Sequence, residues 1–246
     1  MKISSPFLEV AAVLLSLLPV TQAQAYTSWK VADVPSSGLK DISFPMSIAN
    51  APHVAGFYFA QQFSFVGQNG VGYTGLQPRK DSDSSSIIHA VFSSFIAGTT
   101  SDDDNCSDGA DGGAGVSCAA DIPATYDGTY QLKISNTEGT TWTGTLVHTD
   151  SGNESHIGTY TIPSGSGGIT GSQIGFVEYY PWNSPKPHKC SKLPYTSIVF
   201  GSPKTSTEGA GEGSLGGAFE AGDCIGKVGF QTERTSDTVK ITVGFQ

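Results

Sequence analysis

The stretch Phe57-Tyr58-Phe59-Ala60-Gln61-Gln62-Phe63-Ser64-Phe65 decides the fold of this chain. Its odd positions are aromatic except for Gln61, whereas its even positions hold Tyr58 and then smaller or more polar residues. A period of two residues is typical of a β-strand that turns one set of side chains to each face of a sheet. The stretch therefore predicts a strand whose aromatic face lies against a hydrophobic core.

The same alternation recurs along the chain, and no stretch keeps a helical period over three turns. The further alternating segments are residues 88–92, 130–134, 141–146, 157–162, 174–180, 197–200, 228–231 and 239–245. Clusters of Gly, Asn, Asp and Pro separate them, as expected of turns. We predict an all-β fold, an antiparallel β-sandwich of jelly-roll type with about ten strands, and a barrel as the less favoured alternative. The polar segments 101–115 and 202–217 are expected to be surface loops.

The N-terminal residues predict secretion. Lys2 precedes an almost wholly apolar run over residues 7–20, and Ala23-Gln24-Ala25 is a small-x-small cleavage site. We expect residues 1–25 to be a secretory signal peptide and residues 26–246 to form a single β-sandwich domain. A membrane anchor is the alternative, but the run is shorter than the roughly 20 residues that a spanning helix needs. The expected location is extracellular, without membrane insertion.

The charge of the chain limits its partners. There are 22 acidic and 13 basic residues, which gives a net charge of −9, and no Lys/Arg cluster interrupts this balance. An acidic surface repels phosphate groups, so we expect no nucleic-acid partner. The sequence gives no indication of the oligomeric state.

All four cysteines lie after the predicted signal peptide, which predicts two disulfides in an oxidising compartment. Three pairings are possible. We favour Cys106 with Cys118 and Cys190 with Cys224, because each pair then brackets a turn-rich stretch. A metal site is the alternative, but there is no Cys-x-x-Cys and no His close to the first two cysteines.

Two asparagines lie in glycosylation sequons, which suit a secreted glycoprotein. Asn153 is followed by Glu154 and Ser155 in a turn-rich segment, and Asn105 is followed by Cys106 and Ser107. We expect Asn153 to be the better acceptor, because a disulfide would lie next to Asn105.

An acidic segment offers a weak calcium site. Its oxygen ligands would be Asp102, Asp104, Asp108 and Asp111. The segment does not follow the EF-hand pattern, and a solvated acidic loop closed by a disulfide is the simpler interpretation. We expect no cofactor, with calcium as the alternative.

No established catalytic motif is present: there is no Gly-x-Ser-x-Gly and no His-Glu-x-x-His. We therefore expect no catalytic residues and lean against an enzyme. One remaining route is a carboxylate-pair glycosidase, with Glu178, Glu154, Glu220 and Asp223 as possible members. The other is a lyase-like site with His89 or Tyr58 as the base.

The best ligand surface in the sequence is the segment from Phe176 to Asn183. Aromatic rings can cover the apolar face of a sugar while polar side chains bind its hydroxyl groups. The alternative is that these aromatic residues belong to the core or cap the edge of the sheet. The predicted ligand-binding residues are Glu178, Tyr179, Tyr180, Trp182 and Asn183.

The aromatic strand also carries a family resemblance. Residues Phe57–Phe63 and Gly72–Arg79 resemble a signature of the DUF3472 family, secreted microbial domains of unknown function. Similar features follow in order at Ala90–Ser93, Thr141–Gly144 and Phe176–Glu178. The resemblance covers most of the chain after the predicted signal peptide. It implies secretion and a β fold, and it implies no established activity.

One segment departs from the pattern of that family. An acidic loop of the Gly-Glu-Gly type is expected before the second cysteine, and this chain has Gly109-Ala110-Asp111-Gly112-Gly113 instead. A shorter carboxylate therefore occupies this loop.

Our leading hypothesis is a secreted carbohydrate-binding or cell-surface-interacting β-sandwich without catalysis, with a glycan or cell-wall polysaccharide as its partner. The first alternative is a polysaccharide-active enzyme, a glycosidase or a lyase, with acidic residues in a cleft. The second is a secreted effector or structural protein that binds a protein partner. Fold analogy does not decide among them.

Overall fold

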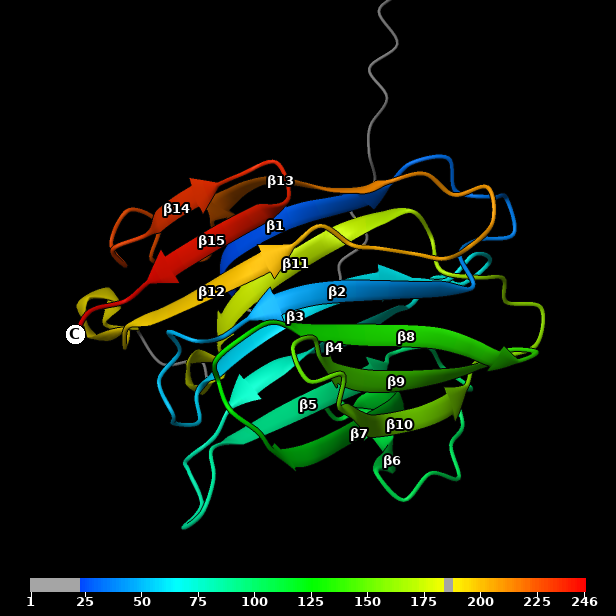
Figure 1. The fold of residues 1–246 in the computed structure, drawn as a ribbon, viewed down its shortest axis with the longest axis horizontal. Helices are drawn as coiled ribbons and strands as arrows, with labels where there is room; N and C mark the ends of the chain where they lie inside the picture. The colour runs from blue at the N-terminus through cyan, green and yellow to red at the C-terminus, as the bar shows by residue number, and fades with distance from the viewer. Residues whose placement is uncertain (1–22, 184–187) are drawn as a thin grey trace, which may run out of the picture.

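The computed structural model describes residues 23–183 and 188–246 and consists of two antiparallel β-sheets packed face to face (Figure 1). The predicted class, an antiparallel β-sandwich, is confirmed, and with fifteen strands among the described residues the number expected was too low. No helix in these two ranges is long and apolar enough to cross a membrane.

The first sheet has eight strands, here called the site sheet. In spatial order they are β13 (Gly213–Glu220), β1 (Ala23–Val31), β11 (Ser172–Tyr179), β3 (Phe57–Ser64), β4 (Val71–Pro78), β5 (Ile87–Ser94), β7 (Gly113–Pro123) and β6 (Cys106–Ala110).

The second sheet has seven strands. In spatial order they are β10 (Glu154–Thr161), β9 (Thr141–His148), β8 (Tyr130–Glu138), β2 (Asp41–Ser47), β12 (Thr196–Gly201), β15 (Thr238–Val243) and β14 (Gln231–Arg234). Two short 3₁₀ helices, η1 (Tyr180–Trp182) and η2 (Cys190–Lys192), lie between β11 and β12.

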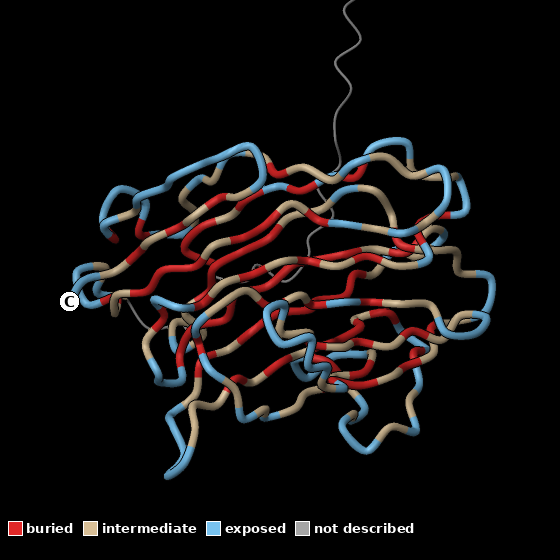
Figure 2. The backbone as a smooth tube through the Cα atoms, viewed as in Figure 1, coloured by how far each residue is buried: buried red, intermediate tan, exposed pale blue. Residues whose placement is uncertain are grey.

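The aromatic strand β3 lies in the middle of the site sheet and is buried on both faces (Figure 2). Its odd aromatic residues, Phe57, Phe59 and Phe63, are at most 1% exposed and pack in the core between the sheets. Its even residues Tyr58 and Ala60 join a second apolar cluster on the outer face. The site sheet therefore has an outer face that is covered in part by its own side chains.

Gln61 is a polar exception inside the core. Its side chain is fully buried, and neither its amide oxygen nor its amide nitrogen has a hydrogen-bond partner among the described residues. The neighbouring Gln62 is also buried, but its Nε2 donates to Gln173 Oε1 at 2.6 Å. A buried amide without partners destabilises a fold, whereas a satisfied one does not.

Both predicted disulfides are present, with the sequential pairing. Cys106–Cys118 joins β6 to β7, and Cys190–Cys224 joins η2 to the segment before β14. The first disulfide packs on the second sheet at Gly158, where an added Cβ would lie 2.7 Å from Cys106 Sγ. The segment 101–115, expected to be a loop, instead forms β6 and the start of β7, because the disulfide and cross-strand pairing order it as a hairpin.

Strand β1 begins inside the predicted signal peptide. Ala23 and Ala25 are buried, and Gln24 Oε1 accepts a hydrogen bond from the Tyr179 N–H at 2.5 Å. A cut after Ala25 would remove three residues from this strand. The rest of the predicted signal peptide, residues 1–22, lies outside the described residues, and the cleavage position stays a prediction.

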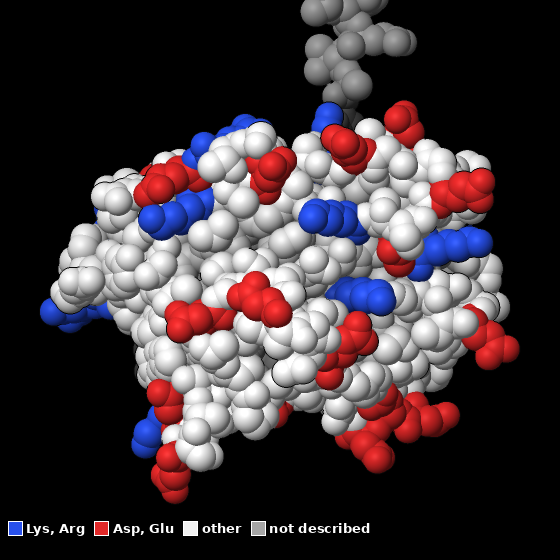
Figure 3. Space-filling view, in the orientation of Figure 1, with Lys and Arg blue, Asp and Glu red and all other residues white. Residues whose placement is uncertain are grey.

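Charged side chains are scattered on the face of the molecule seen in Figure 3, without a basic patch. Both predicted glycosylation positions, Asn105 and Asn153, are exposed. Glycosylation of either asparagine stays a prediction.

We expect Gln61→Met to raise the free energy of unfolding by about 1–3 kcal/mol, because the substitution removes an unsatisfied amide and keeps an unbranched side chain. Chemical denaturation of the folded protein measures this change. The matched control is Gln62→Met, which should lower the free energy because it breaks the bond to Gln173. A loss of stability in both variants would show that Gln61 has a partner that stabilises it.

Candidate functional site

A row of polar side chains crosses five strands of the site sheet. Glu178 on β11 pairs with Tyr58 on β3, and Gln77 on β4 pairs with His89 on β5, which in turn pairs with Asp121 on β7. The register of β3 with β4 starts at Phe59 and Leu76, so Tyr58 and Gln77 are next in line. Residues directly opposite each other in a sheet point to the same face. This row, here called the polar row, therefore lies on the outer face.

Four members of the polar row line a pocket of about 660 Å³ over this outer face: Glu178, Tyr58, Gln77 and His89. The floor of the pocket depends on Gly75, where an added Cβ would lie 2.7 Å from Tyr58 Cε2. A side chain at this position would displace the tyrosine ring. Glycine at this position therefore leaves the room that the Tyr58 ring occupies.

Glu178 is the chemically most unusual residue of the pocket. It is 5% exposed and is the one charged residue in the buried set of the described ranges. Its Oε1 accepts a hydrogen bond from Asn183 Nδ2 at 2.9 Å. Burial raises the pKa of the Glu178 carboxyl, the bond from Asn183 lowers it, and the charge of Asp111 raises it further. A carboxyl group of this kind is ionised less readily than usual and exchanges protons nearer to neutral pH.

The helix η1 brings Asn183 to this carboxyl group. Pro181 lies at the start of η1, the Tyr180 N–H donates to Gly56 O at 3.0 Å, and the Asn183 N–H donates to Tyr180 O at 3.0 Å. Proline suits the first turn of a helix, because its missing N–H would be unpaired there in any case. The tight turn after β11 thus folds the chain back so that its last residue reaches Glu178.

Tyr58 and Tyr73 form the aromatic wall beside Glu178. Burial raises the pKa of both hydroxyl groups, and the neighbouring charges of Glu178 and Asp111 raise it further. The rings of Tyr73 and Phe95 are 4.7 Å apart. The Tyr58 hydroxyl is buried and has no hydrogen-bond partner among the described residues.

Gln77 is held in one orientation by Arg79. Arg79 Nη2 donates to Gln77 Oε1 at 2.8 Å, and Arg79 Nη1 donates to Pro78 O at 3.1 Å. A guanidinium group can only donate, so the amide oxygen of Gln77 must face it. The amide nitrogen of Gln77 donates to no group of the described residues, and the side chain lines the pocket. Gln77 is therefore a directed hydrogen-bond donor.

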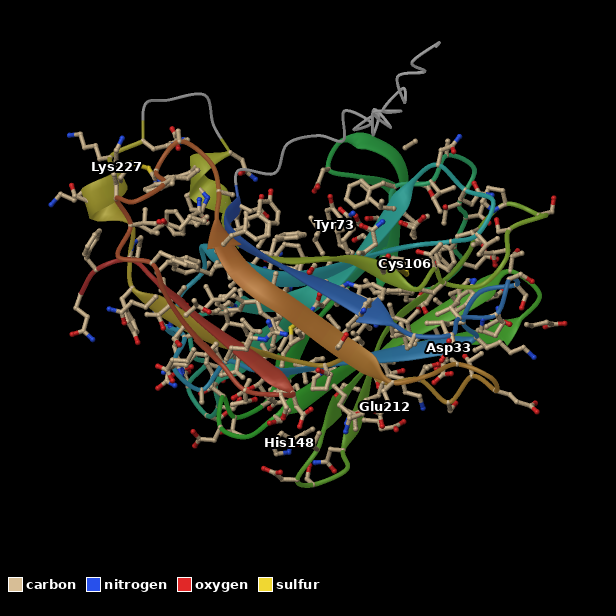
Figure 4. All side chains as sticks on the ribbon, turned by 90° about the horizontal axis from the view of Figure 1, so that it is seen from above. Asp33, Tyr73, Cys106, His148, Glu212 and Lys227 are labelled. Atoms are coloured by element: carbon tan, nitrogen blue, oxygen red, sulfur yellow. A yellow bond between two sulfur atoms is a disulfide. The ribbon has the colours of Figure 1, made fainter. Side chains whose placement is uncertain are left out.

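His89 and Asp111 complete the chemistry of the pocket. His89 Nδ1 lies 2.7 Å from Asp121 Oδ1. Burial lowers the pKa of His89, although the bond to Asp121 opposes this change. Asp111 lies at the turn between β6 and β7, and it lines the pocket together with Glu178. Figure 4 shows this hairpin on the same side of the molecule as Tyr73.

The predicted ligand-binding residues are divided between two environments. Glu178, Tyr180 and Asn183 line the pocket. Tyr179 packs against Phe57 with ring centroids 5.0 Å apart, and Trp182 stacks on His188 at 4.9 Å. The segment turns over at η1, so its aromatic residues do not form one flat exposed surface.

The other predicted carboxylates do not join Glu178. Glu154 is on β10 of the second sheet, Glu220 accepts a bond from the Gly226 N–H, and Asp223 pairs with His188. The proposed bases His89 and Tyr58 do line the pocket.

The structure also disperses the predicted calcium ligands. No group of three or more His, Cys, Asp or Glu in the described ranges could hold a metal ion. Asp111 lines the pocket, whereas the pocket lining contains none of the three other predicted ligands, Asp102, Asp104 and Asp108.

Sequence reasoning did not assign Gln77 or Arg79 to the pocket, and it considered Asp111 only as a weak calcium ligand. A signal existed for Gln77 and Arg79, because the first lies at the end of β4 and the second, two residues later, follows directly after this strand. The strand pairing that places them in the same pocket as Glu178 had no signal in the sequence.

No known protein family matches the chain, and no curated protein matches it. The predicted resemblance to the DUF3472 family therefore stays a prediction. Among solved structures, the chain is similar to scytalido-glutamic peptidase in complex with a peptide-based transition-state analogue. The identity is 12%, the match covers 90% of this chain and 98% of that one, and the TM-score is 0.51. This likeness shows a shared fold.

A second similar structure is SCP-B, a member of the eqolisin family of peptidases, in complex with the tripeptide Ala-Ile-His. The identity is 10%, the match covers 92% of this chain and 100% of that one, and the TM-score is 0.46.

The predicted function is contradicted by the first of these neighbours. We expected a carbohydrate-binding or cell-surface-interacting protein without catalysis, and the structure with the shared fold is described as a peptidase. The prediction failed because it took Tyr179 and Trp182 to be part of one exposed aromatic surface, whereas both pack against the core. The two alternative functions in the same prediction are set aside with it.

We expect the stability of the protein to depend on pH through Glu178. Its pKa in the folded state is raised above the ordinary 4.5, so the folded state binds the proton more tightly than the unfolded state. The free energy of unfolding should therefore fall as the pH rises from about 4.5 through the raised pKa. The Glu178→Gln variant has no titrating proton at this position, so its free energy of unfolding should not show this decrease.

Urea denaturation of the wild type and of the variant between pH about 3 and about 8 measures the difference. Glu154→Gln, on the exposed start of β10, is the matched control and should follow the wild type. Parallel curves for the wild type and Glu178→Gln would contradict a raised pKa.

Proposed function

We propose that this protein is a secreted peptidase that hydrolyses peptide bonds with Glu178 as its general base. The observation that carries the proposal is the position of Glu178, a buried carboxyl group in the pocket, in the polar row with Gln77. The shared fold with a structure described as a glutamic peptidase supports this proposal. The two disulfides are consistent with an extracellular location.

The chemistry requires one base and one donor. The Glu178 carboxylate takes a proton from a water molecule, and the water oxygen bonds to the carbonyl carbon of the peptide. Negative charge then develops on the carbonyl oxygen, and the free N–H groups of Gln77 donate to it. The protonated Glu178 gives its proton to the leaving nitrogen as the C–N bond breaks. The products are a carboxylic acid and an amine, and Glu178 is regenerated.

The environment of Glu178 suits both steps. A carboxyl group in water is a weak base, whereas a raised pKa makes it a stronger one. Arg79 supports Gln77, because its guanidinium group polarises the amide and fixes which end faces the pocket. We assign Arg79 as a positioning residue for this donor.

We expect Glu178→Gln to abolish peptide cleavage and Gln77→Ala to lower kcat by about 10²–10³-fold, the usual cost of one oxyanion donor. The measurement is mass spectrometry of products from a peptide mixture, with the protein purified from culture medium. Glu154→Gln is the control and should cleave as the wild type does. Cleavage that survives in Glu178→Gln would refute the role of Glu178, and a wild type that cleaves no peptide would refute the proposed function.

We also expect the activity to follow the ionisation of Glu178. A general base must be deprotonated, so kcat/KM should rise with pH through the raised pKa of Glu178. Asn183→Ala removes the hydrogen bond that lowers this pKa, and the rising limb of the profile should therefore move to higher pH. The pH profiles of the two proteins measure the shift. A limb that stays in place, or moves to lower pH, would show that another group controls the rate.

A further inference from the structure

A negatively charged side chain that the proposed mechanism does not use faces the same pocket. Asp111 lies at the tip of the β6–β7 hairpin and is exposed, with its backbone at a φ of 48°. Left-handed backbone is uncommon outside glycine, although Asp tolerates it better than most residues. The Cys106–Cys118 disulfide closes the base of the hairpin. The position of Asp111 is thus fixed by the fold and is not that of a free loop.

The carboxylate of Asp111 forms no ion pair with a cationic side chain of the described residues. No hydrogen bond or ion pair of its side chain is present among the described residues. Its charge acts on Glu178, Tyr58 and Tyr73, and it raises the pKa of all three. Arg79 also lines the pocket, and its side-chain hydrogen bonds go to the neutral groups of Gln77 and Pro78. Asp111 therefore has no direct cationic partner among the described residues.

The surroundings of Asp111 suit a cation. Tyr58, Tyr73, Phe95 and Tyr180 line the same pocket, and the faces of aromatic rings attract ammonium and guanidinium groups. The Tyr58 side chain is more than nine-tenths buried, and its hydroxyl oxygen has no donor among the described residues. A buried hydroxyl group without a partner costs free energy unless a ligand supplies one. This second observation is independent of the charge and also indicates a ligand.

We propose that the pocket selects substrates that carry a Lys or Arg side chain, with Asp111 as the counter-ion of its ammonium or guanidinium group. The cation donates to the Asp111 carboxylate and lies against the aromatic wall, and the Tyr58 oxygen accepts from it. The inference rests on the proposed function for cleavage, but binding tests it separately.

The binding experiment uses the catalytically inactive Glu178→Gln protein and calorimetry at pH about 6, where an ordinary Asp is ionised. The probes are the capped tripeptides acetyl-Ala-Lys-Ala-amide and acetyl-Ala-norleucine-Ala-amide, which differ in the charge. We expect the Lys peptide to bind about tenfold or more tightly, the gain of one charge-assisted bond. When Asp111→Asn is introduced into the Glu178→Gln protein, the two peptides should bind with equal affinity. When Asp108→Asn is introduced instead, the preference for the Lys peptide should stay unchanged, because Asp108 lies on the same hairpin but outside the pocket lining.

A cleavage experiment separates the two proposals. With the wild type, matched Lys and norleucine substrates should differ in kcat/KM by a similar factor, and Asp111→Asn should remove that difference while norleucine cleavage continues. Lys-selective binding without any cleavage would refute the peptidase and leave the cation site in place. Equal binding of both probes to Glu178→Gln, or a preference that survives Asp111→Asn, would overturn the cation site while the peptidase stands.

Discussion

The structure depends on the burial of both faces of strand β3. A strand in the middle of a large sheet leaves two apolar faces to cover, and exposed apolar surface costs about 25 cal/mol per Å². The second sheet covers the inner face, where Phe57, Phe59 and Phe63 pack. Among the described residues, no third layer covers the outer face. It is covered by aromatic side chains of the site sheet itself, by η1 and by the β6–β7 hairpin, and the pocket is the part that these elements leave open.

This incomplete cover explains why a carboxyl group can be chemically unusual here. Glu178 lies deep enough to lose most of its contact with water, so its ionised form is disfavoured. One hydrogen bond, donated by the side-chain amide of Asn183, partly compensates that loss. Full burial would cost several kcal/mol, and full exposure would leave an ordinary carboxylate. The walls of the pocket therefore set the basicity of Glu178, because they determine how much water reaches its carboxyl group.

Sequence reasoning recovers the parts of the molecule that depend on local patterns. The alternation in β3 predicted its inner face, the cysteine order agreed with the disulfides, and Glu178, Tyr180 and Asn183 were found together because one short segment carries them. Gln77 was not found, because it shares a pocket with Glu178 only through the pairing of β11 with β3 and of β3 with β4. Strand order across a sheet is set by tertiary packing, and no local period encodes it. The error at Trp182 has the same origin, since the turn at η1 decides which face its ring joins. The inward side of Tyr179 follows instead from its alternation with Glu178 on β11, which the sequence does carry.

The disulfide of the hairpin connects fold and site. The pair Cys106–Cys118 lies at the edge of the site sheet and rests on Gly158 of the second sheet, where a side chain would push it away. This contact joins the two sheets at the base of the hairpin and so holds the tip of the hairpin in place. Asp111 is shorter than Glu by one methylene group, and a short side chain loses less conformational freedom when it is held in one place. A rigid hairpin with a short carboxylate at its tip places a charge over the pocket at low entropic cost, which a flexible surface loop could not do.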